Sequence, residues 1–487
     1  MKDSRLIELL STFDEEELNS FKKFLLSPFN KSKRNIGSLL NYLISIRLEF
    51  NSEKSNKEFV FKKLFPGEKF NYKKLENLTL DLYNSAKSFL VHKTIEEDEL
   101  ECQIFLSKAF YNKKLSEHSM KTLAQVEKKL KPEFISDKDY FSKLRQITFL
   151  KSAYYTKYNE FDNLIESKRN YFEASATQFI IDSAEFLSIR KPVLDTHGKN
   201  IENYFIESVM KSFDIDKMIK LLEKDDNANI PIITLHYYRL KTIDEPDTED
   251  HYFKLRDYFY ENLDNLNRGE KCFIFNHLTS YCVNKLVGKD KSDFEKEGLD
   301  VYKKMLENNA YSMSESEYMQ PLMYRNIYQF CNVTKDSKWF KIFIDEYSFT
   351  LDPEYRKDLS NMAYAYYFFM IKKFEKALEM ISGIRGEFFL FKSDLKNLSL
   401  KIYYEVGYIE QAYSLVDAHR HFLANSKEIS AFHKDAGNKF LKYYNTLLKI
   451  KCNQSKEDPG LIKSKLIKEE KIASKVWLIE KADELIK

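Results

Sequence analysis

The feature that most constrains this chain is a helix-pair pattern that occurs twice, in nearly the same register, between Tyr355 and Leu423. In the first copy, residues 359–384, side chains suited to a contact between antiparallel helices are Ala365, Phe368, Phe374, Ala377 and Ile381. In the second copy, residues 394–419, the matching side chains are Leu400, Tyr403, Ile409, Ala412 and Val416. Ala377 and Ala412 are 35 residues apart, which is close to the period of a repeated helix-turn-helix unit.

Each copy contains the residues that a close helix crossing and a tight turn require. Ala377 and Ala412 occupy the positions where the second helix would cross the first, and a larger side chain there would push the backbones apart. The turn between the helices is Lys372-Lys373 in the first copy and Gly407 in the second, where glycine adopts a positive φ at little cost. The stretch therefore predicts two consecutive antiparallel helix pairs.

With its small, aromatic, aromatic, alanine spacing, the stretch resembles the tetratricopeptide repeat family. The family's first-helix tryptophan and glycine are absent, because Asn361 and Ala365 stand at those places in the first copy, so the repeats are degenerate. The resemblance implies a right-handed α-solenoid in which the first helices of successive pairs line a concave, peptide-binding surface.

Composition extends this expectation to the whole chain. Only 11 Gly and 9 Pro occur in 487 residues, which leaves little material for hairpin turns or flexible linkers. We therefore expect an all-α protein in which a repeat array replaces several separate domains. The predicted parts are an N-terminal helical bundle at 1–98, a degenerate helix-pair array at 99–426 and C-terminal capping helices at 427–487.

Several boundaries within these parts can be predicted. A helix from Glu15 to Leu26 has acidic residues in its first turn and is stopped by Pro28. A helical block that begins at Lys138 is expected to end at Arg190-Lys191-Pro192. The last helix is expected to run unbroken from Leu461 to Ile486 as a terminal cap, with Trp477 as its anchor.

The order of features also resembles an uncharacterised bacterial helical-repeat family. Members of that family begin with a Leu- and Ile-rich helix and a Ser-Pro-Phe-Asn segment, here Ser27 to Asn30, and carry a Phe-Pro-Gly turn, here Phe65 to Gly67. The resemblance covers nearly the whole chain and implies degenerate helical repeats. It brings no activity with it.

Charge and cysteine usage exclude several classes of protein. Lys and Arg number 78 and Asp and Glu 75, so the chain has no global basic field to hold nucleic acid or an anionic membrane. The five cysteines include no CxxC pair, which favours reduced thiols. No secretory signal and no run of 18 apolar residues occurs, so we expect a cytoplasmic location and no membrane partner.

Residues 56–90 support an alternative function. A helix ending before Pro66-Gly67 and a second amphipathic helix resemble the helix-turn-helix units of bacterial transcriptional activators that also carry helical repeats. A DNA-binding regulator with a repeat sensor region is the alternative that this resemblance implies. The second helix carries Glu76 and Asp81 beside its lysines and no wing follows it, which disfavours nucleic acid.

Catalytic and metal motifs do not stand out. The chain lacks a phosphate-binding Gly-rich loop, a dinucleotide fingerprint and a nucleophile elbow, so we expect no enzyme and no cofactor, with a hydrolase whose site goes unrecognised as the third possibility. Asp417, His419 and His421 are close in sequence, but residues two apart on a helix point to opposite faces, so no metal site is expected even if His433 approaches.

The remaining candidate site is the concave groove that the repeat resemblance implies. Its partner-binding residues would be Met362, Tyr366, Phe369, Asn397, Lys401, Tyr404 and Glu405. Asn, Lys and Tyr could hydrogen-bond an extended peptide, and Met and Phe could accept apolar side chains. The alternative is that neighbouring helices cover several of these side chains. The leading hypothesis is thus a non-enzymatic scaffold that binds a peptide or protein partner.

Overall fold

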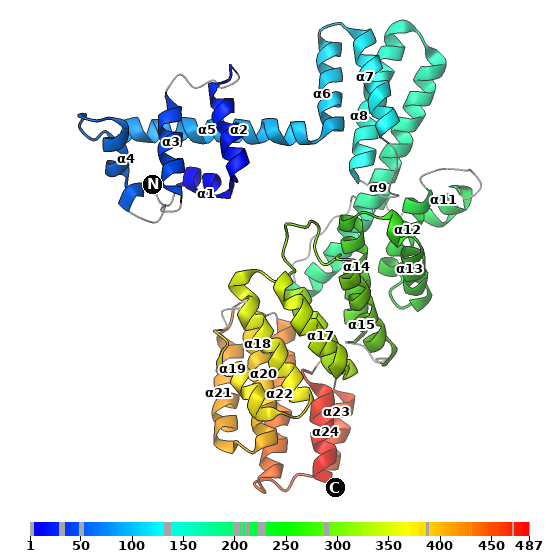
Figure 1. Cartoon of the computed structure of the whole chain (residues 1–487). Coiled ribbons are helices and arrows are strands. Elements are labelled where there is room, and N and C mark those ends of the chain that lie inside the picture. Colours follow the sequence, from blue (N-terminus) through cyan, green and yellow to red (C-terminus); the bar gives the residue numbers. More distant parts are fainter. Residues whose placement is uncertain are drawn as a thin grey trace. The chain divides into compact units, whose positions relative to one another are not determined.

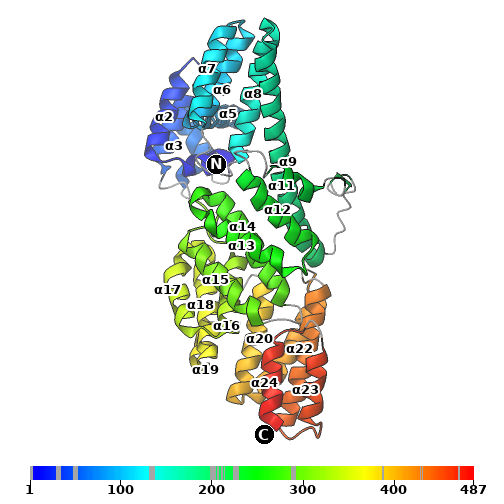
Figure 2. The same cartoon turned by 90° about the vertical axis from the view of Figure 1, so that its right-hand side faces the viewer.

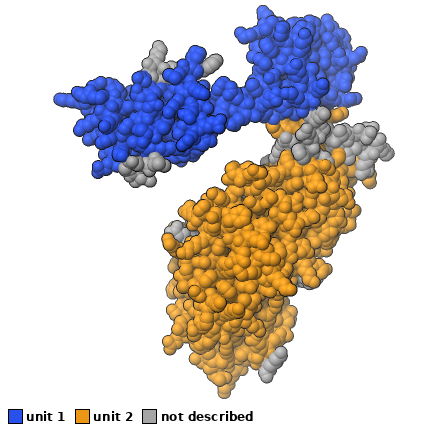
Figure 3. All heavy atoms as spheres, viewed as in Figure 1, with its two compact units in different colours: residues 1–131, 143–171 blue, residues 132–142, 172–487 orange. Residues whose placement is uncertain are grey.

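The computed structural model of the chain describes residues 4–28, 35–47, 53–130, 138–197, 205, 208–209, 212, 214–222, 230–286, 292–385, 389–427, 429, 431–469 and 472–486. These residues form helices and connecting turns without a strand, which confirms the all-α prediction (Figure 1). The chain divides into two compact units, residues 1–131 with 143–171 and residues 132–142 with 172–487 (Figure 3). The three-part division of the sequence stays a prediction.

An N-terminal helical bundle belongs to the first unit. Its second helix begins with a capping box, in which Asp14 and Glu17 accept each other's backbone N–H groups, and it ends at Leu26 as predicted. The rings of Phe13, Phe21 and Phe89 pack together in the core, with centroids 5.3 to 5.9 Å apart. The helices are α1 Arg5–Thr12, α2 Glu15–Leu26, α3 Ile36–Ser45, α4 Lys57–Leu64 and α5 Tyr72–Glu97.

Four helices follow the bundle in sequence: α6 Glu99–Asn112, α7 Ser116–Lys129, α8 Lys138–Tyr158 and α9 Phe161–His197. Small residues let α6 and α7 approach closely, since the Ser107 and Ser119 hydroxyls are buried and 2.8 Å apart. The predicted break at Pro192 is wrong, because α9 continues to His197. A proline removes one backbone donor, and here that loss does not end the helix. Within the described ranges, no helix is both long and apolar enough to cross a membrane.

The second unit includes α9 from Phe172 onward and a series of helices that contact their neighbours in sequence. Its helices are α11 Ile215–Leu222, α12 Ile230–Asp244, α13 Glu249–Glu261, α14 Arg268–Leu286, α15 Ser292–Glu307, α16 Pro321–Thr334, α17 Ser337–Tyr347, α18 Pro353–Met370, α19 Phe374–Ser382, α20 Phe389–Val406, α21 Ile409–Asn425, α22 Ala431–Lys451, α23 Pro459–Lys468 and α24 Lys475–Ile486. In addition, α18 contacts both α16 and α20, so these three helices form one layer.

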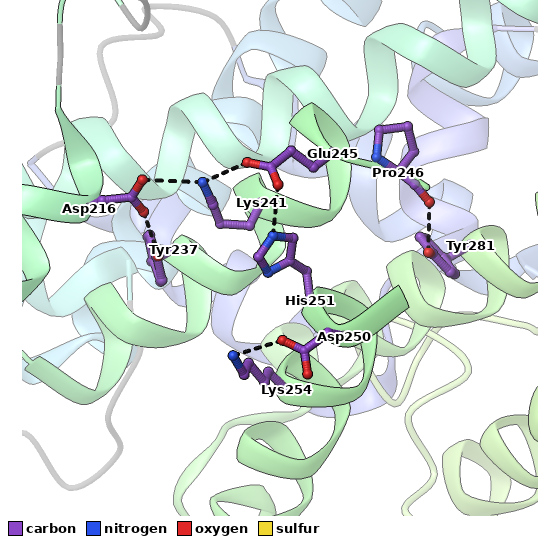
Figure 4. Close-up of polar contacts among 9 residues, drawn as sticks. All are labelled: Asp216, Tyr237, Lys241, Glu245, Pro246, Asp250, His251, Lys254 and Tyr281. Atoms are coloured by element: carbon purple, nitrogen blue, oxygen red, sulfur yellow. Dashed lines mark hydrogen bonds and ion pairs between the residues drawn. The ribbon is translucent and has the colours of Figure 1, made fainter. Parts of the chain in front are cut away.

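Polar contacts join α11, α12 and the turn before α13 at the surface (Figure 4). Lys241 lies between Asp216, 3.3 Å away, and Glu245, 2.9 Å away, and His251 contacts the second oxygen of Glu245. On the other side of the turn, the Tyr281 hydroxyl donates to the Pro246 carbonyl at 2.8 Å. These contacts fix the turn between α12 and α13 from both sides.

One turn geometry recurs between the two helices of a pair. At each such turn a residue with positive φ follows the first helix. The backbone N–H of the residue after it donates to the carbonyl of the residue five positions before the donor, at 2.8 to 3.0 Å. The positive-φ residues are Lys114, Asn159, Lys372, Gly407 and Asn453. The predicted turns at Lys372-Lys373 and Gly407 are therefore confirmed.

The C-terminal part differs from the prediction. The expected unbroken helix at 461–486 is divided into α23 and α24, and Ser474, with a φ of 52°, lies just before α24. The Ala473 N–H donates to the Ala436 carbonyl, which holds this turn on α22. The reversal lets Ile462 and Leu466 of α23 and Leu478 of α24 share one apolar core, which a straight helix could not do.

Candidate functional site

The candidate site is a set of polar side chains on one side of the α16, α18 and α20 layer. We call it the inner face and define it by six residues: Arg325, Tyr328, Tyr366, Asp394, Asn397 and Lys401. Arg325 and Tyr328 come from α16, Tyr366 from α18, and the other three from α20. On α20 they recur at helical spacing, which gives one continuous stripe.

An ion pair joins the two outer helices of the layer. The Arg325 Nε donates to the Asp394 carboxylate, and both side chains are largely buried. Burial disfavours the charged guanidinium, but the Asp394 carboxylate outweighs this effect and raises the pKa of Arg325 above its usual value. The guanidinium therefore stays charged, and its bond to Asp394 links α16 to α20.

Two stacked tyrosines lie beside the pair. The rings of Tyr328 and Tyr366 are 5.1 Å apart with an angle of 28° between their planes, and both side chains are buried. Burial raises the pKa of both phenols, so they are neutral at physiological pH. Among the described residues, the Tyr328 hydroxyl has no hydrogen-bond partner.

Lys401 is a buried cation without a carboxylate partner. Only 5% of the residue is exposed, and its Nζ lies 5.6 Å from the Tyr366 ring centroid and 5.2 Å from that of Phe369. No described carboxylate lies within ion-pair distance of it. Burial lowers the pKa of Lys401 to about 8, although Asp394 partly opposes this shift. One turn earlier, the side-chain oxygen of Asn397 also lacks a partner among the described residues.

These groups could bind a polar partner group. The Lys401 ammonium and the Tyr328 hydroxyl can donate hydrogen bonds, and the Asn397 oxygen can accept one. In the described part of the chain, no three His, Cys, Asp or Glu side chains are grouped so that they could hold a metal ion. The inner face therefore offers hydrogen-bonding groups, charge and aromatic rings to a bound group.

Next to the inner face, α20 contacts the last helix, α24 (Figure 2). The Trp477 indole meets the Tyr404 ring edge to face at 5.3 Å and stacks on Tyr444 at 6.1 Å. Its Nε1 donates to Glu405 at 3.1 Å, and the Lys481 Nζ lies 2.7 Å from the same carboxylate. The predicted role of Trp477 as anchor of the terminal helix agrees with these contacts.

The predicted groove residues do not line an open groove. Met362, Tyr366, Asn397, Lys401 and Tyr404 are buried, and Phe369 and Glu405 are half-buried. The physical reason is that α18 and α20 pack side by side while α24 covers Tyr404 and Glu405. The alternative considered for the sequence, in which neighbouring helices cover these side chains, describes the structure better.

The histidine cluster separates as its spacing predicts. His419 is fully buried and contacts Ser393, whereas Asp417 and His421 are exposed, with Asp417 paired to Arg420. Burial, with a contribution from Lys396, lowers the pKa of His419 to about 4, so this imidazole is neutral.

Arg325 and Tyr328 were missed by the sequence analysis, although a signal for them exists. Arg325 lies ten residues before Lys335, which has a φ of 56°, just as Met362 and Asn397 lie ten residues before Lys372 and Gly407. Extending the repeat register by one pair toward the N-terminus would have placed Arg325 beside the predicted groove residues.

The N-terminal bundle contains a hollow of about 450 Å³ between α2 and α5. Its lining includes five carboxylates, those of Asp14, Glu16, Glu17, Glu96 and Glu97. Lys93 pairs with Glu17 at 2.5 Å, and this hydrogen bond lowers the pKa of the Glu17 carboxyl. The negative charge of the lining would repel phosphate groups.

Comparison with known proteins gives no relative. No family model matches the chain, and no curated protein or solved structure matches it.

Proposed function

We propose that this chain is a non-enzymatic scaffold that binds a peptide or protein partner through the inner face of a right-handed α-solenoid of degenerate tetratricopeptide-like helix pairs. The helix pairs from α16 to α21 support the solenoid. The pairs α18/α19 and α20/α21 share one turn geometry, and in α16 the ten-residue spacing from the inner residue to the positive-φ residue is the same. The first helices of the three pairs form a layer. The capping helices α23 and α24 would close the array at one end.

The observation that carries the proposal is the set of polar groups on the inner face. The Asn397 oxygen is buried without a hydrogen-bond partner among the described residues, which costs roughly 1–3 kcal/mol, and Lys401 is buried with no described carboxylate within ion-pair distance. An apolar residue at either position would avoid this cost. Retaining them is reasonable if a partner that reaches them when the neighbouring helices move apart supplies the missing acceptor and donor.

The DNA-binding alternative gains no support from the N-terminal bundle. Leu75, Leu78 and Leu82 of α5 face the bundle core, and the hollow beside α5 is lined by carboxylates. Nucleic acid binding would require a basic surface at this place.

The test is affinity purification of the tagged full-length chain from its own host at moderate salt, with and without nuclease treatment. The variant should change the inner face without emptying the core, so Arg325 and Asp394 are exchanged in Arg325→Asp/Asp394→Arg. This exchange keeps an ion pair but reverses its direction. The control is Lys376→Glu on the exposed side of α19.

We expect one protein to be retained by the wild type and by Lys376→Glu and to be lost from the exchanged variant, with similar circular dichroism for all three. Retention of that protein by the exchanged variant would move the binding surface elsewhere. Recovery that disappears on nuclease treatment would instead favour the DNA-binding alternative.

A further inference from the structure

Helix α24 binds to α20 through contacts that resemble those of a bound ligand. Three of its side chains, Trp477, Glu480 and Lys481, point toward earlier parts of the array. Trp477 and Lys481 share the Glu405 carboxylate, and Glu480 pairs with Lys335 at 3.2 Å, in the turn after α16. The helix thus contacts residues up to 145 positions earlier, in addition to its sequence neighbours α22 and α23.

The contact is specific in its chemistry. The indole is only 8% exposed and lies between Tyr404 and Tyr444, with its N–H bonded to Glu405. The ammonium of Lys481 is one helical turn further along and is almost fully buried against the same carboxylate. A surface that recognises an indole and an ammonium four residues apart selects one face of a helix.

We propose that the surface formed by Tyr404, Glu405 and Tyr444 is a helix-binding site that α24 occupies in cis, and that its external partner is an amphipathic helix carrying a tryptophan four residues before a lysine. This inference rests on the proposed scaffold function and specifies its partner. Binding of the partner would require α24 to leave, so the scaffold would be closed until a competing helix is present.

The connections of the terminal helices are compatible with such an exchange. The turn before α24 is held on α22 by a 3.3 Å backbone hydrogen bond from Ala473 to Ala436 and by Glu469, which pairs with Lys439 at 3.2 Å. The loop between α22 and α23, residues 452–458, is polar and has a positive φ at Asn453. Because α24 is tethered, its effective concentration is in the millimolar range, so a free helix competes poorly with the wild-type arrangement.

The test uses the full-length chain and a fluorescent peptide with the sequence of residues 472–486. Three chains are compared: the wild type, Lys481→Glu and Glu405→Lys. In Lys481→Glu the chain's own helix is repelled by Glu405 while the site stays intact. In Glu405→Lys the helix is also repelled, but the site has the reversed charge. A second peptide carries the same Lys481→Glu change.

We expect the wild-type peptide to bind the Lys481→Glu chain at least about tenfold more tightly than the wild-type chain. It should bind the Glu405→Lys chain no better than the wild type, and the charge-reversed peptide should bind the Glu405→Lys chain instead. Equal binding of the wild-type peptide to all three chains would overturn the proposal, as would a failure of the reversed peptide to recover binding.

A second measurement distinguishes release of α24 from misfolding of the chain. The chain has two tryptophans, so in a Trp339→Phe background the emission of Trp477 alone reports whether α24 is seated. Lys481→Glu should shift this emission to longer wavelength, with little change in helix content. An unchanged emission would contradict release of α24.

If the peptide results hold but no partner is recovered from the host, only the scaffold function fails. If the host partner is recovered but the peptide results fail, only this inference fails.

Discussion

The helix pairs α18/α19 and α20/α21 share a framework and differ at the positions where the repeat resemblance places a groove. Both have a positive φ at the turn, Lys372 and Gly407, and a fully buried alanine at the crossing, Ala377 and Ala412. At inner positions 35 residues apart, the first pair has mostly apolar and aromatic residues and the second mostly polar ones. The first pair has Leu359, Met362, Tyr366, Phe369 and Met370, and the second has Asp394, Asn397, Lys401, Tyr404 and Glu405.

The comparison shows that the repeat fixes the residues of the turn and the crossing and leaves the inner positions free to vary. A turn and a close crossing need the same backbone and the same small side chain in every copy. The inner positions carry no such requirement, and burying Asn397 and Lys401 there lowers stability relative to the apolar residues of the first pair. Such a stability cost, confined to one copy, is typical of residues kept for binding.

The largest change in the free energy of unfolding should come from substitutions at the helix crossings that both pairs share. Ala377→Leu and Ala412→Leu would each force extra atoms into a closed crossing and should lower the free energy of unfolding by about 2–3 kcal/mol, equally in both pairs. Urea unfolding followed by tryptophan fluorescence measures this, because both tryptophans lie in the second unit. Ala418→Leu, at an exposed position of α21, should be nearly neutral. A cost seen in only one pair would show that the two crossings are not equivalent.

The second-largest effect should be an increase in the free energy of unfolding. Lys401→Met removes a buried ammonium and should stabilise the second unit by about 2 kcal/mol at pH 7. The pKa of Lys401 is about 8 when folded, below its value of about 10.4 when unfolded, so the unfolded state binds more protons between these values. Wild-type stability should therefore rise as the pH increases from 8 to about 10.

This rise should be absent in Lys401→Met and present in the control Lys376→Met, whose lysine is exposed. Urea midpoints at pH 7, 8, 9 and 10 provide the comparison. A Lys401→Met chain that is less stable than the wild type at pH 7 would mean that the ammonium is satisfied in the folded state, and the argument for a missing partner would fail.

The smallest effect concerns the turns. Lys372→Gly should raise stability by about 0.5–1 kcal/mol, since a lysine at a φ of 59° is strained, and Gly407→Ala should lower it by about 1 kcal/mol. A Cβ at Gly407 would meet no atom within 4 Å, so only backbone strain is measured there. Thermal unfolding of both variants checks the signs. Changes of the same sign would mean that the two turns are not equivalent.

The sequence predicts the framework better than the inner face because the two depend on different ranges of interaction. Alanine at a crossing, an acidic first turn and a glycine turn act locally, so α2 and the pairs from α18 to α21 lie where they were expected. Whether Tyr366 or Lys401 is exposed depends on helices distant in sequence. The packing of Trp477 on Tyr404 depends on a reversal before α24 that the continuous apolar stripe of residues 461–486 concealed.

Helix α24 also has a consequence for synthesis of the protein on the ribosome. Helices that contact their sequence neighbours can fold as they emerge, but the sides of Tyr404 and Glu405 that contact Trp477 and Lys481 can be covered only after residues 475–486 have been made. The 80 residues from 407 to 486 take roughly 4–16 s to translate at about 5–20 residues per second. During that interval each nascent chain exposes an aromatic and acidic surface, so a partner or chaperone present at the ribosome would meet it before its own last helix does.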